Sequence, residues 1–477
     1  MENALTILSA VIAVPFIGFL FVLTAKDDEQ TRGRNALSVA MLAMIANVLL
    51  IWRIMVLVDL DKSGLQLVET YRWLENPRID IVFGVDLFSL LLILALHLAV
   101  IIGIIGTGRR GGQTKSMMVW TLLFVSMITG LLVSADIFSF YIFFEAMLLP
   151  LFMLIGMFGE IKKQPGIFRF FIYNFLGAVF LFIATVVTYH HENHSIALDY
   201  VSRIRFNPHL ELFVWGAIFI SFLSRIPIWP FHYWISSVNA AVRNPLVFII
   251  ANLVPLTGVY GFIRFFPRTV PDSAQYFLDI LEIISIISML FIALIGLINK
   301  DIQYKLFSYL TVYYIMFMLG ALLPTDTILL NIGFSLFAFL IIAALLEVLT
   351  LYIEGEQNSK ELNAHGILCY VPRLSFVYSF LVLAAVGFPL SSLFLNNFVI
   401  FAHLFSYNLQ AGIVIMLSTV IVAAAVLQEL YVFKDESRVT PDGVCIMDLP
   451  VSAFLWLLSA IAVLVITFIN PLWFMGV

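Results

Sequence analysis

Long apolar runs recur along the whole chain, and they restrict its possible folds more than any other feature. A single apolar helix of about 20 residues crosses the hydrocarbon core of a bilayer, and the run from Ala4 to Ala25 is one of many that are long enough. Hydrophobic residues occupy 62% of the 477 positions and charged residues 12%, whereas soluble domains have roughly 45 to 50% and about 25%. The sequence therefore excludes a soluble protein and predicts one that crosses a membrane many times.

Clusters of charged, polar, Gly and Pro residues divide the chain into fourteen candidate spans. We expect an all-α polytopic membrane protein, because continuously apolar runs do not match the alternating strands of a membrane barrel. The spans lie near residues 4–25, 36–58, 84–106, 117–134, 136–158, 167–188, 210–230, 244–264, 274–298, 304–323, 327–353, 371–404, 408–433 and 449–475. We group them as 1–116 (N-terminal transmembrane helices 1–3), 117–265 (a first repeat, helices 4–8), 266–433 (a second repeat, helices 9–13) and 434–477 (C-terminal helix 14).

Lysine and arginine are distributed unevenly between the predicted loops. Basic residues accumulate in the cytoplasmic loops of membrane proteins. If the N-terminus lies outside, the inner loops hold 16 Lys and Arg residues and the outer loops hold 7. This bias favours an outer N-terminus, and an even number of spans then places the C-terminus on the outer face as well.

Two spans contain helix-breaking residues deep in the membrane. Span 7 runs into Pro-Ile-Trp-Pro at 227–230, and span 12 contains Gly-Phe-Pro-Leu-Ser-Ser at 387–392. Proline removes a backbone donor and clashes with the preceding turn, so each motif indicates either a simple kink or a discontinuous helix. The breaks lie five helices apart, and paired broken helices in inverted repeats are typical of transporter cores. We therefore expect two inverted five-helix repeats.

Two charged residues fall inside the spans, where ionisable groups are costly and are functional candidates by default. Glu145 lies about 12 Å from the outer end of span 5, and Arg225 about 21 Å into span 7, at 1.5 Å per residue. A carboxylate and a guanidinium about 4 Å apart attract by roughly 4 kcal/mol at an effective dielectric constant near 20. Movement of Arg225 would then switch Glu145 between ionised and protonated forms, although arginine itself does not release a proton. The alternative is a static buried ion pair that fixes helix register.

Other candidates in the spans have simpler interpretations. His97 lies near the middle of span 3 and could pass protons, but a lone histidine on an apolar helix is more often a packing residue with its hydrogen bonds satisfied. Glu282, Glu347 and Glu429 fall near predicted span ends, where contacts with water or lipid headgroups suffice.

Metal, nucleotide and nucleic-acid sites are not indicated. The formal net charge of −5 gives no sign of a nucleic-acid partner. The Gly-rich stretch 106–112 resembles a phosphate loop but lacks the following Lys-Ser or Lys-Thr. A polar outer loop carries residues of metal-ligand type, from which we expect no metal site: His190, His191, Glu192 and His194. Cys369 and Cys445 have no paired spacing that would suggest a disulfide framework or an iron–sulfur site.

Several motifs together resemble those of a known family. The segment 138–156, FSFYIFFEAMLLPLFMLIG, is similar to the span-5 signature of the antiporter-like M chains of NADH:quinone oxidoreductase (respiratory complex I), the counterparts of mitochondrial chain 4. Further pieces agree with their spans 3, 7, 8 and 12, and the resemblance covers about residues 80–405. These pieces are Gly-Val-Asp at 84–86 followed by Phe-Ser-Leu-Leu, Pro-Ile-Trp-Pro-Phe-His-Tyr-Trp at 227–234, Gly-Val-Tyr-Gly at 258–261 followed by Ile-Arg-Phe, and Gly-Phe-Pro at 387–389.

The resemblance implies a membrane-arm subunit that moves protons while quinone is reduced elsewhere in the complex. It places Glu145 on the family's essential span-5 glutamate and Arg225 on its span-7 lysine. It implies no redox cofactor in this chain, with NAD, FMN, iron–sulfur clusters and quinone in partner subunits. The expected partners are the antiporter-like L and N chains, and the expected location is a bacterial plasma membrane or a mitochondrial inner membrane.

The chain departs from the family at several positions of the proton relay. Leu256 replaces the central span-8 lysine, Phe337 a span-11 histidine and Asn397 the glutamate after the span-12 break. Two polar family stretches also become Ser-Val-Asn at 237–239 and Leu-Thr-Val-Tyr-Tyr at 310–314. Relay groups must gain and lose a proton near the working pH, which these replacements do not do.

Three functions therefore stay open from the sequence. The first is a proton channel in which water held by polar side chains substitutes for the missing relay groups: Ser391, Ser392, Asn396, Asn397 and Tyr313. The second is a divergent scaffold that keeps the fold and has lost transport. The third is a subunit of a multi-chain sodium/proton antiporter.

Overall fold

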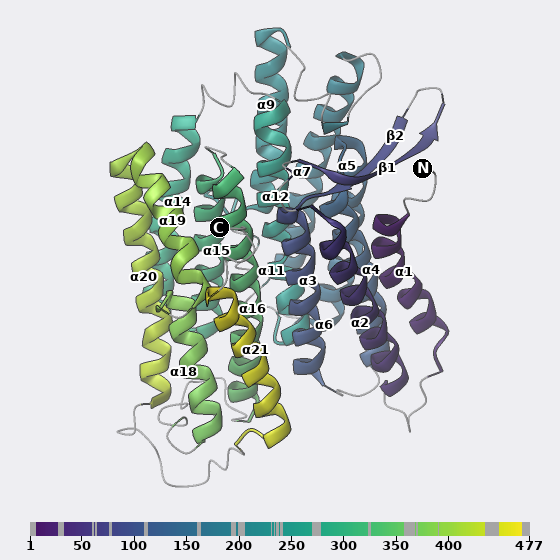
Figure 1. Ribbon diagram of the computed structural model, residues 1–477. Coiled ribbons are helices and arrows are strands. Elements are labelled where there is room, and N and C mark those ends of the chain that lie inside the picture. The colour runs from purple at the N-terminus through teal and green to yellow at the C-terminus, as the bar shows by residue number, and fades with distance from the viewer. Residues whose placement is uncertain are drawn as a thin grey trace.

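The computed structural model is a bundle of long helices capped at one end by a small hairpin (Figure 1). It describes residues 6–26, 33–59, 62, 64–75, 79–108, 113–159, 164–191, 197–198, 206–229, 231–232, 234, 238, 242–269, 278–322, 326–356, 368, 371–389, 391–434 and 448–469.

Each of the fourteen predicted spans coincides with one helix or with two helices in succession. The N-terminal half of the bundle contains α1 (Ile7–Thr24), α2 (Arg34–Leu57), α3 (Leu87–Thr107), α4 (Thr114–Val133), α5 (Ile137–Ala146), α6 (Leu148–Phe158), α7 (Gln164–His191), α9 (Pro208–Arg225), α11 (Pro245–Asn252) and α12 (Val254–Thr269). The C-terminal half contains α14 (Leu278–Ile298), α15 (Ile302–Gly320), α16 (Asp326–Glu356), α18 (Pro372–Val386), α19 (Ser392–Tyr407), α20 (Leu409–Lys434) and α21 (Val451–Ile469).

The helical fold class is confirmed. Among the described residues, ten helical segments are long and apolar enough to cross a membrane, and three further apolar helices are shorter. That all fourteen segments cross, and that they form inverted repeats, stay predictions. Apolar side chains remain exposed along α2, α7 and α20, as at Leu49, Phe168 and Val420, which is the surface that lipid covers in a polytopic protein.

A two-stranded antiparallel hairpin, which the all-helical expectation did not include, lies at one end of the bundle. It comprises β1 (Gln66–Leu74) and β2 (Ile79–Val85). The loop between α4 and α5 holds it in place, since Ala135 donates to the Val82 carbonyl (2.8 Å) and Val82 donates to the Asp136 carboxylate (2.8 Å). Glu69 in β1 also accepts from the backbone N–H of Leu8 (2.8 Å), which places a carboxylate at the N-terminus of α1, where the helix dipole favours it.

Both predicted helix breaks are present, and side chains satisfy backbone groups around the first one. Helix α9 ends at Arg225, two residues before Pro227. The Trp234 indole donates to the Ser224 carbonyl (2.9 Å), and the Ser288 hydroxyl of α14 accepts from Trp229 N–H (2.9 Å). Such replacement partners are what allow irregular backbone to persist in a membrane interior.

The second break is closed by a glycine in the left-handed conformation. Helix α18 ends at Val386, and Gly387 follows with φ of +80°. The N–H groups of Gly387 and Phe388 bond back to the carbonyls of Ala384 and Leu383 (3.1 and 3.0 Å), which is the Schellman arrangement. Glycine adopts this backbone conformation without steric cost, so the motif favours a true interruption over a proline kink.

Candidate functional site

Glu145 lies near the C-terminal end of α5, at the kink between α5 and α6. Its helix begins at Ile137, and the side chain of the preceding Asp136 accepts from Ser139 N–H as an N-cap. The kink has a local cause, because Pro150 cannot donate a hydrogen bond to the carbonyl of Ala146 one turn earlier. The Glu145 side chain is half-buried, and its buried Oε2 has no hydrogen-bond partner among the described residues. A carboxyl group therefore faces the protein interior with one oxygen available to a proton or a water molecule.

Arg225 lies beside Glu145, although the two do not form the direct ion pair that the sequence predicted. The guanidinium is fully buried and donates from Nη2 to the backbone carbonyl of Phe144 (2.6 Å). It also lies over the Phe144 ring, 3.6 Å from the ring centroid, a favourable cation–π position. No ion pair within 4 Å joins Arg225 to Glu145, and the buried Nε and Nη1 of Arg225 have no hydrogen-bond partner in the described part of the chain.

The end of α9 explains this arrangement. Because the helix stops at Arg225, the guanidinium extends from a helix end across to the backbone immediately before Glu145. The guanidinium is thus held at Phe144, the residue that directly precedes Glu145 in the chain. The sequence predicted that Glu145 and Arg225 lie near each other, but it did not predict that Arg225 bonds to the Phe144 carbonyl.

Two glycines allow neighbouring helices to approach the arginine closely. A Cβ atom on Gly258 of α12 would lie 2.8 Å from Arg225 Cβ, and one on Gly177 of α7 would lie 1.9 Å from Ser224 Oγ. Both distances are shorter than real Cβ contacts. Aromatic rings complete the surroundings, with Phe222 edge-on to Phe144 at 6.2 Å between ring centroids. Arg225 is therefore enclosed in a tightly packed, mostly apolar shell.

The three positions where the family resemblance implied relay groups are buried. Leu256 is inaccessible and Phe337 is 5% exposed, so neither position supplies a proton carrier. Asn397 accepts from the Ser335 hydroxyl (3.2 Å) across the α16–α19 interface. Near this asparagine in sequence, the buried hydroxyl groups of Ser391 and Ser392 have no hydrogen-bond partner among the described residues.

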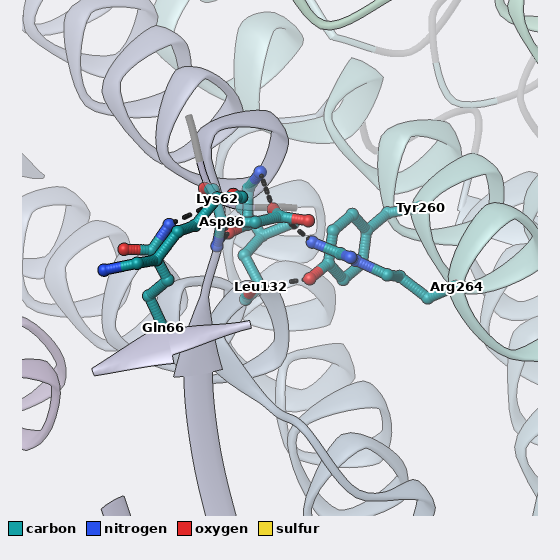
Figure 2. A network of polar contacts seen from close by, with 7 residues as sticks. Lys62, Gln66, Asp86, Leu132, Tyr260 and Arg264 are labelled. Carbon is teal, nitrogen blue, oxygen red and sulfur yellow. Dashed lines mark hydrogen bonds and ion pairs between the residues drawn. The ribbon is translucent and has the colours of Figure 1, made fainter. Parts of the chain in front are cut away.

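A polar network that sequence reasoning did not assign joins α3, α4 and α12 (Figure 2). Asp86 precedes α3 as its N-cap, receives a hydrogen bond from Ser89 N–H (2.9 Å) and forms an ion pair with Arg264 of α12. The Arg264 guanidinium also lies 5.3 Å from the Tyr260 ring centroid. Tyr260 in turn donates to the carbonyl of Leu132 at the end of α4 (2.7 Å). Gly-Val-Asp and Ile-Arg-Phe were both noted as family motifs, yet nothing in the sequence indicated that they meet.

The network sets the charge state of Asp86, which directly precedes the candidate membrane-crossing helix Leu87–Thr107. Burial of the carboxyl raises its pKa, but the adjacent Arg264 charge and the hydrogen bonds from Ser89 lower it by more. The pKa of Asp86 therefore lies below its ordinary value, and the ion pair persists at neutral pH.

His97 has both ring nitrogens hydrogen-bonded, which confirms the packing interpretation. Nδ1 lies 2.7 Å from the Ile93 carbonyl, so it must carry the hydrogen. Nε2 then accepts from the amide of Asn47 in α2 (2.7 Å), and that amide also donates to the Val11 carbonyl in α1 (3.0 Å). The neutral histidine thus ties three N-terminal helices together.

The three glutamates that were expected near solvent are all buried. Glu282 is 8% exposed and accepts from the Asn408 amide (2.9 Å), and Glu347 is 1% exposed in the interior of α16. Glu429 is 3% exposed and forms an ion pair with Lys305 of α15. The expectation that these three glutamates contact water or lipid headgroups is therefore wrong, because all three are buried. It failed because neighbouring helices pack against these positions and cover them.

The remaining metal-type candidates lie largely outside the described residues. Glu192, His194, Cys369 and Cys445 are not described, whereas the His191 ring packs against Phe206 at 4.7 Å between centroids. Among residues that are described, no group of three or more His, Cys, Asp or Glu side chains could hold a metal ion.

Comparisons with known proteins place these features in one family. The sequence profile described as NADH:quinone oxidoreductase/Mrp antiporter, transmembrane, matches residues 134–422. NADH-quinone oxidoreductase subunit M of Rickettsia typhi is 28% identical over 437 residues, which cover 90% of this chain and 87% of that one. NADH-ubiquinone oxidoreductase chain 4 of Marchantia polymorpha is 25% identical over 429 residues, which cover 87% and 84%. A chain of respiratory complex I from Thermus thermophilus with bound NADH has the same fold, with a TM-score of 0.84 at 18% identity over 98% of this chain and 96% of that one.

Proposed function

The chain belongs to the NADH:quinone oxidoreductase/Mrp antiporter transmembrane family, and from this premise we propose that it is a membrane-arm subunit of a proton-translocating NADH:quinone oxidoreductase. In this role it forms a proton channel that is coupled to quinone reduction in other subunits. The observation that carries the proposal is the Glu145 carboxyl, which lies in the bundle interior with an unpartnered oxygen beside a buried arginine.

The arginine controls the proton affinity of the carboxyl without carrying a proton itself. In the arrangement described, Arg225 is held by the Phe144 carbonyl, and Glu145 is free to hold a proton. If the guanidinium turns from that carbonyl to the carboxylate, the nearby positive charge favours the ionised form and the proton is released. Return of the guanidinium to Phe144 then prepares Glu145 to take up the next proton.

Onward transfer must use groups other than those that the family resemblance implied. Hydroxyl groups and ordered water both donate and accept hydrogen bonds, and buried polar atoms without protein partners commonly hold water. The hydroxyls of Ser391 and Ser392, next to the second helix break, are such atoms within the described residues. Together with Asn396, Asn397 and Tyr313 they are our candidates for the substitute path.

The same proposal also implies where the cofactors lie, which subunits are neighbours and how the chain is oriented in the membrane. The chain holds no redox centre of its own, and NAD, FMN, iron–sulfur clusters and quinone belong to partner subunits. Its neighbours are antiporter-like chains of the L and N types in a bacterial plasma membrane or a mitochondrial inner membrane. Both termini lie on the outer face. Residues 117–265 and 266–433 form the two inverted repeats, between N-terminal helices in 1–116 and a C-terminal helix in 434–477.

A non-pumping scaffold is the second candidate, and one specific observation favours it. The Leu256 and Phe337 side chains fill expected relay positions with buried apolar groups, which cannot exchange protons. The third possibility, a subunit of a multi-chain sodium/proton antiporter, predicts that cation tolerance of the cell depends on this chain, whereas the first two do not.

Proton pumping by the assembled complex in sealed vesicles tests the proposal. Glu145→Gln keeps the shape of the side chain and removes its acid, so at equal assembly we expect pumping and coupled NADH oxidation to fall by about tenfold or more. Glu75→Gln is the matched control, because Glu75 is exposed next to the hairpin. Unchanged pumping in Glu145→Gln, in a complex that still needs the chain for assembly, would instead establish the scaffold.

A further inference from the structure

A buried lysine–glutamate pair joins α15 and α20 near the ends of both helices. Lys305 is the fourth residue of α15, and Glu429 lies five residues before the end of α20. Lys305 Nζ donates to the Glu429 carboxylate and also to Gln428 Oε1 (3.0 Å). The side chains of Lys305 and Glu429 are only 4% and 5% exposed.

Burial of this pair is costly, so its presence calls for a physical reason. The desolvation of two charges often exceeds their mutual attraction, and apolar replacements of similar volume are frequently as stable. The lysine also lies close to the N-terminal end of α15, where the helix dipole disfavours a cation. Lysine and glutamate differ from an arginine-containing pair in one respect, because both can exist as neutral groups within a protein.

A row of tyrosines extends from the lysine along the same face of α15. Tyr309 and Tyr313 follow Lys305 at intervals of four residues, which places the three side chains one above another. The Tyr309 and Tyr313 rings contact each other at 4.8 Å between centroids. Tyr309 is 1% exposed, and its hydroxyl has no hydrogen-bond partner among the described residues.

The row ends at the second helix break. The Tyr313 hydroxyl donates to the carbonyl of Ala385 (3.3 Å), in the last turn of α18 before Gly387. Polar side chains therefore connect the buried ion pair with the interrupted helix through the middle of the C-terminal half of the bundle. In Figure 1, α15 lies between α16 and the outer helices α14 and α20. Tyr309 and Tyr313 are both buried.

We propose that Lys305 and Glu429 form a proton-exchange site of this chain, at the inner end of a path that runs along Tyr309 and Tyr313 to the α18–α19 break. The inference rests on the proposed proton-channel function and names residues that the family resemblance did not supply. It also accounts for transport through a chain whose expected relay positions are Leu256 and Phe337.

The exchange cycle conserves protons and needs no other reactant. A proton from the aqueous face adds to the Glu429 carboxylate, forming an O–H bond. The Lys305 ammonium then loses one proton to the tyrosine row or to a water bridging to it, which breaks an N–H bond and leaves a neutral amine. The Glu429 acid finally transfers its proton to that amine, which restores the ion pair. One proton has entered at Glu429 and one has left from Lys305.

Lys305→Arg separates this role from a static ion pair. Arginine keeps the positive charge and can bond to Glu429, but it does not release a proton. In the assembled complex in sealed vesicles we expect Lys305→Arg to slow pumping by about tenfold or more, since positioned proton-transfer groups contribute about 10² to 10⁴-fold to a rate. The matched control is Lys62→Arg, the same substitution at a lysine whose side chain is 71% exposed.

Tyr309→Phe provides a second variant that does not depend on tolerance of arginine. It removes a hydroxyl that has no protein partner in the described part of the chain, so the fold should be unaffected. We expect slower pumping at normal assembly, whereas Tyr431→Phe, at a tyrosine that is 70% exposed on α20, should pump like the wild type. If Lys305→Arg fails to assemble, Tyr309→Phe decides whether the path along α15 carries protons.

The Glu145→Gln variant, measured in parallel, distinguishes failure of the Lys305–Glu429 exchange site from failure of the proposed proton channel. If Glu145→Gln loses pumping while Lys305→Arg and Tyr309→Phe keep the wild-type rate, the proton channel stands and the Lys305–Glu429 pair is structural, which overturns this inference. If Glu145→Gln also pumps normally, the proposed function fails and the inference falls with it. Loss of pumping in all three variants at equal assembly supports both.

Discussion

The guanidinium of Arg225 donates a 2.6 Å hydrogen bond to the backbone carbonyl of Phe144, the residue immediately before Glu145. This contact places a permanent positive charge next to the intramembrane carboxyl without neutralising it. Rotation of the Arg225 side chain can therefore change the electrostatic surroundings of Glu145, because Phe144 and Glu145 are adjacent in the chain.

Replacement of Arg225 by methionine should impair both stability and transport. The Phe144 carbonyl would lose its partner in a buried site, at a cost of about 1 to 3 kcal/mol in the free energy of unfolding. Pumping should fall together with the loss of the charge, whereas Arg225→Lys, which retains a cation and a donor, should retain more activity. Comparison of pumping by the two variants at equal assembly checks this, and equal activity in both would argue against an electrostatic role.

The packing around Arg225 predicts unequal effects of two glycine substitutions. A methyl group on Gly258 would lie 2.8 Å from Arg225 Cβ and 3.0 Å from the Phe222 carbonyl, whereas nothing lies within 4 Å of one on Gly156. Overpacking costs about 1 to 3 kcal/mol, while glycine to alanine in an open helix position can gain up to about 1 kcal/mol. Denaturation in detergent should show Gly258→Ala destabilised and Gly156→Ala unchanged or more stable; the reverse order would refute the close approach.

The Asp86–Arg264 ion pair should be the most stabilising charge contact at its end of the bundle. Asp86→Asn keeps an N-cap residue of similar quality but leaves a buried guanidinium unpaired, which costs about 3 to 5 kcal/mol. Asp59→Asn is the control, because its partner Lys62 is exposed and such surface pairs contribute about 0 to 1 kcal/mol. Similar losses in both variants would contradict the burial described for Arg264.

The same pair predicts a pH dependence of stability. The folded-state pKa of Asp86 lies below its ordinary value of 3.8, so its contribution is fully present above that value and is lost as the pH falls through the folded pKa. The wild type should lose stability over this acidic range, and Asp86→Asn should lose less. Unfolding free energies measured from neutral to acid pH in detergent provide the test, and parallel curves for the two proteins would exclude the predicted contribution.

The helices could be predicted from the sequence, because each is a long apolar run bounded by charged or helix-breaking residues. Both breaks were also predictable, since Pro227 and Gly387 act on their own local backbone. The hairpin was missed because β1 is mostly exposed and its position depends on the distant α4–α5 loop. The partly alternating hydrophobicity of β1 was a weaker signal for structure than the long apolar runs on either side.

The site was only partly predictable for a similar reason. Glu145 and Arg225 stand out as isolated charges in apolar runs, but the bond to Phe144 depends on where α9 ends relative to α5. Lys305 and Glu429 are 124 residues apart, and each alone resembles an ordinary residue at a span end. Contacts between distant helices are set by packing, which hydropathy does not reveal.

Redox-induced infrared difference spectroscopy of the assembled complex tests the central claim most directly, because it observes protonation of carboxyl groups. Turnover should produce a change in the carbonyl stretch of a protonated carboxylic acid. We predict that one component of this signal is lost in Glu145→Gln and retained in Glu75→Gln. If the spectra of Glu145→Gln and wild type are identical during turnover, Glu145 does not exchange a proton, and the proposed channel is wrong.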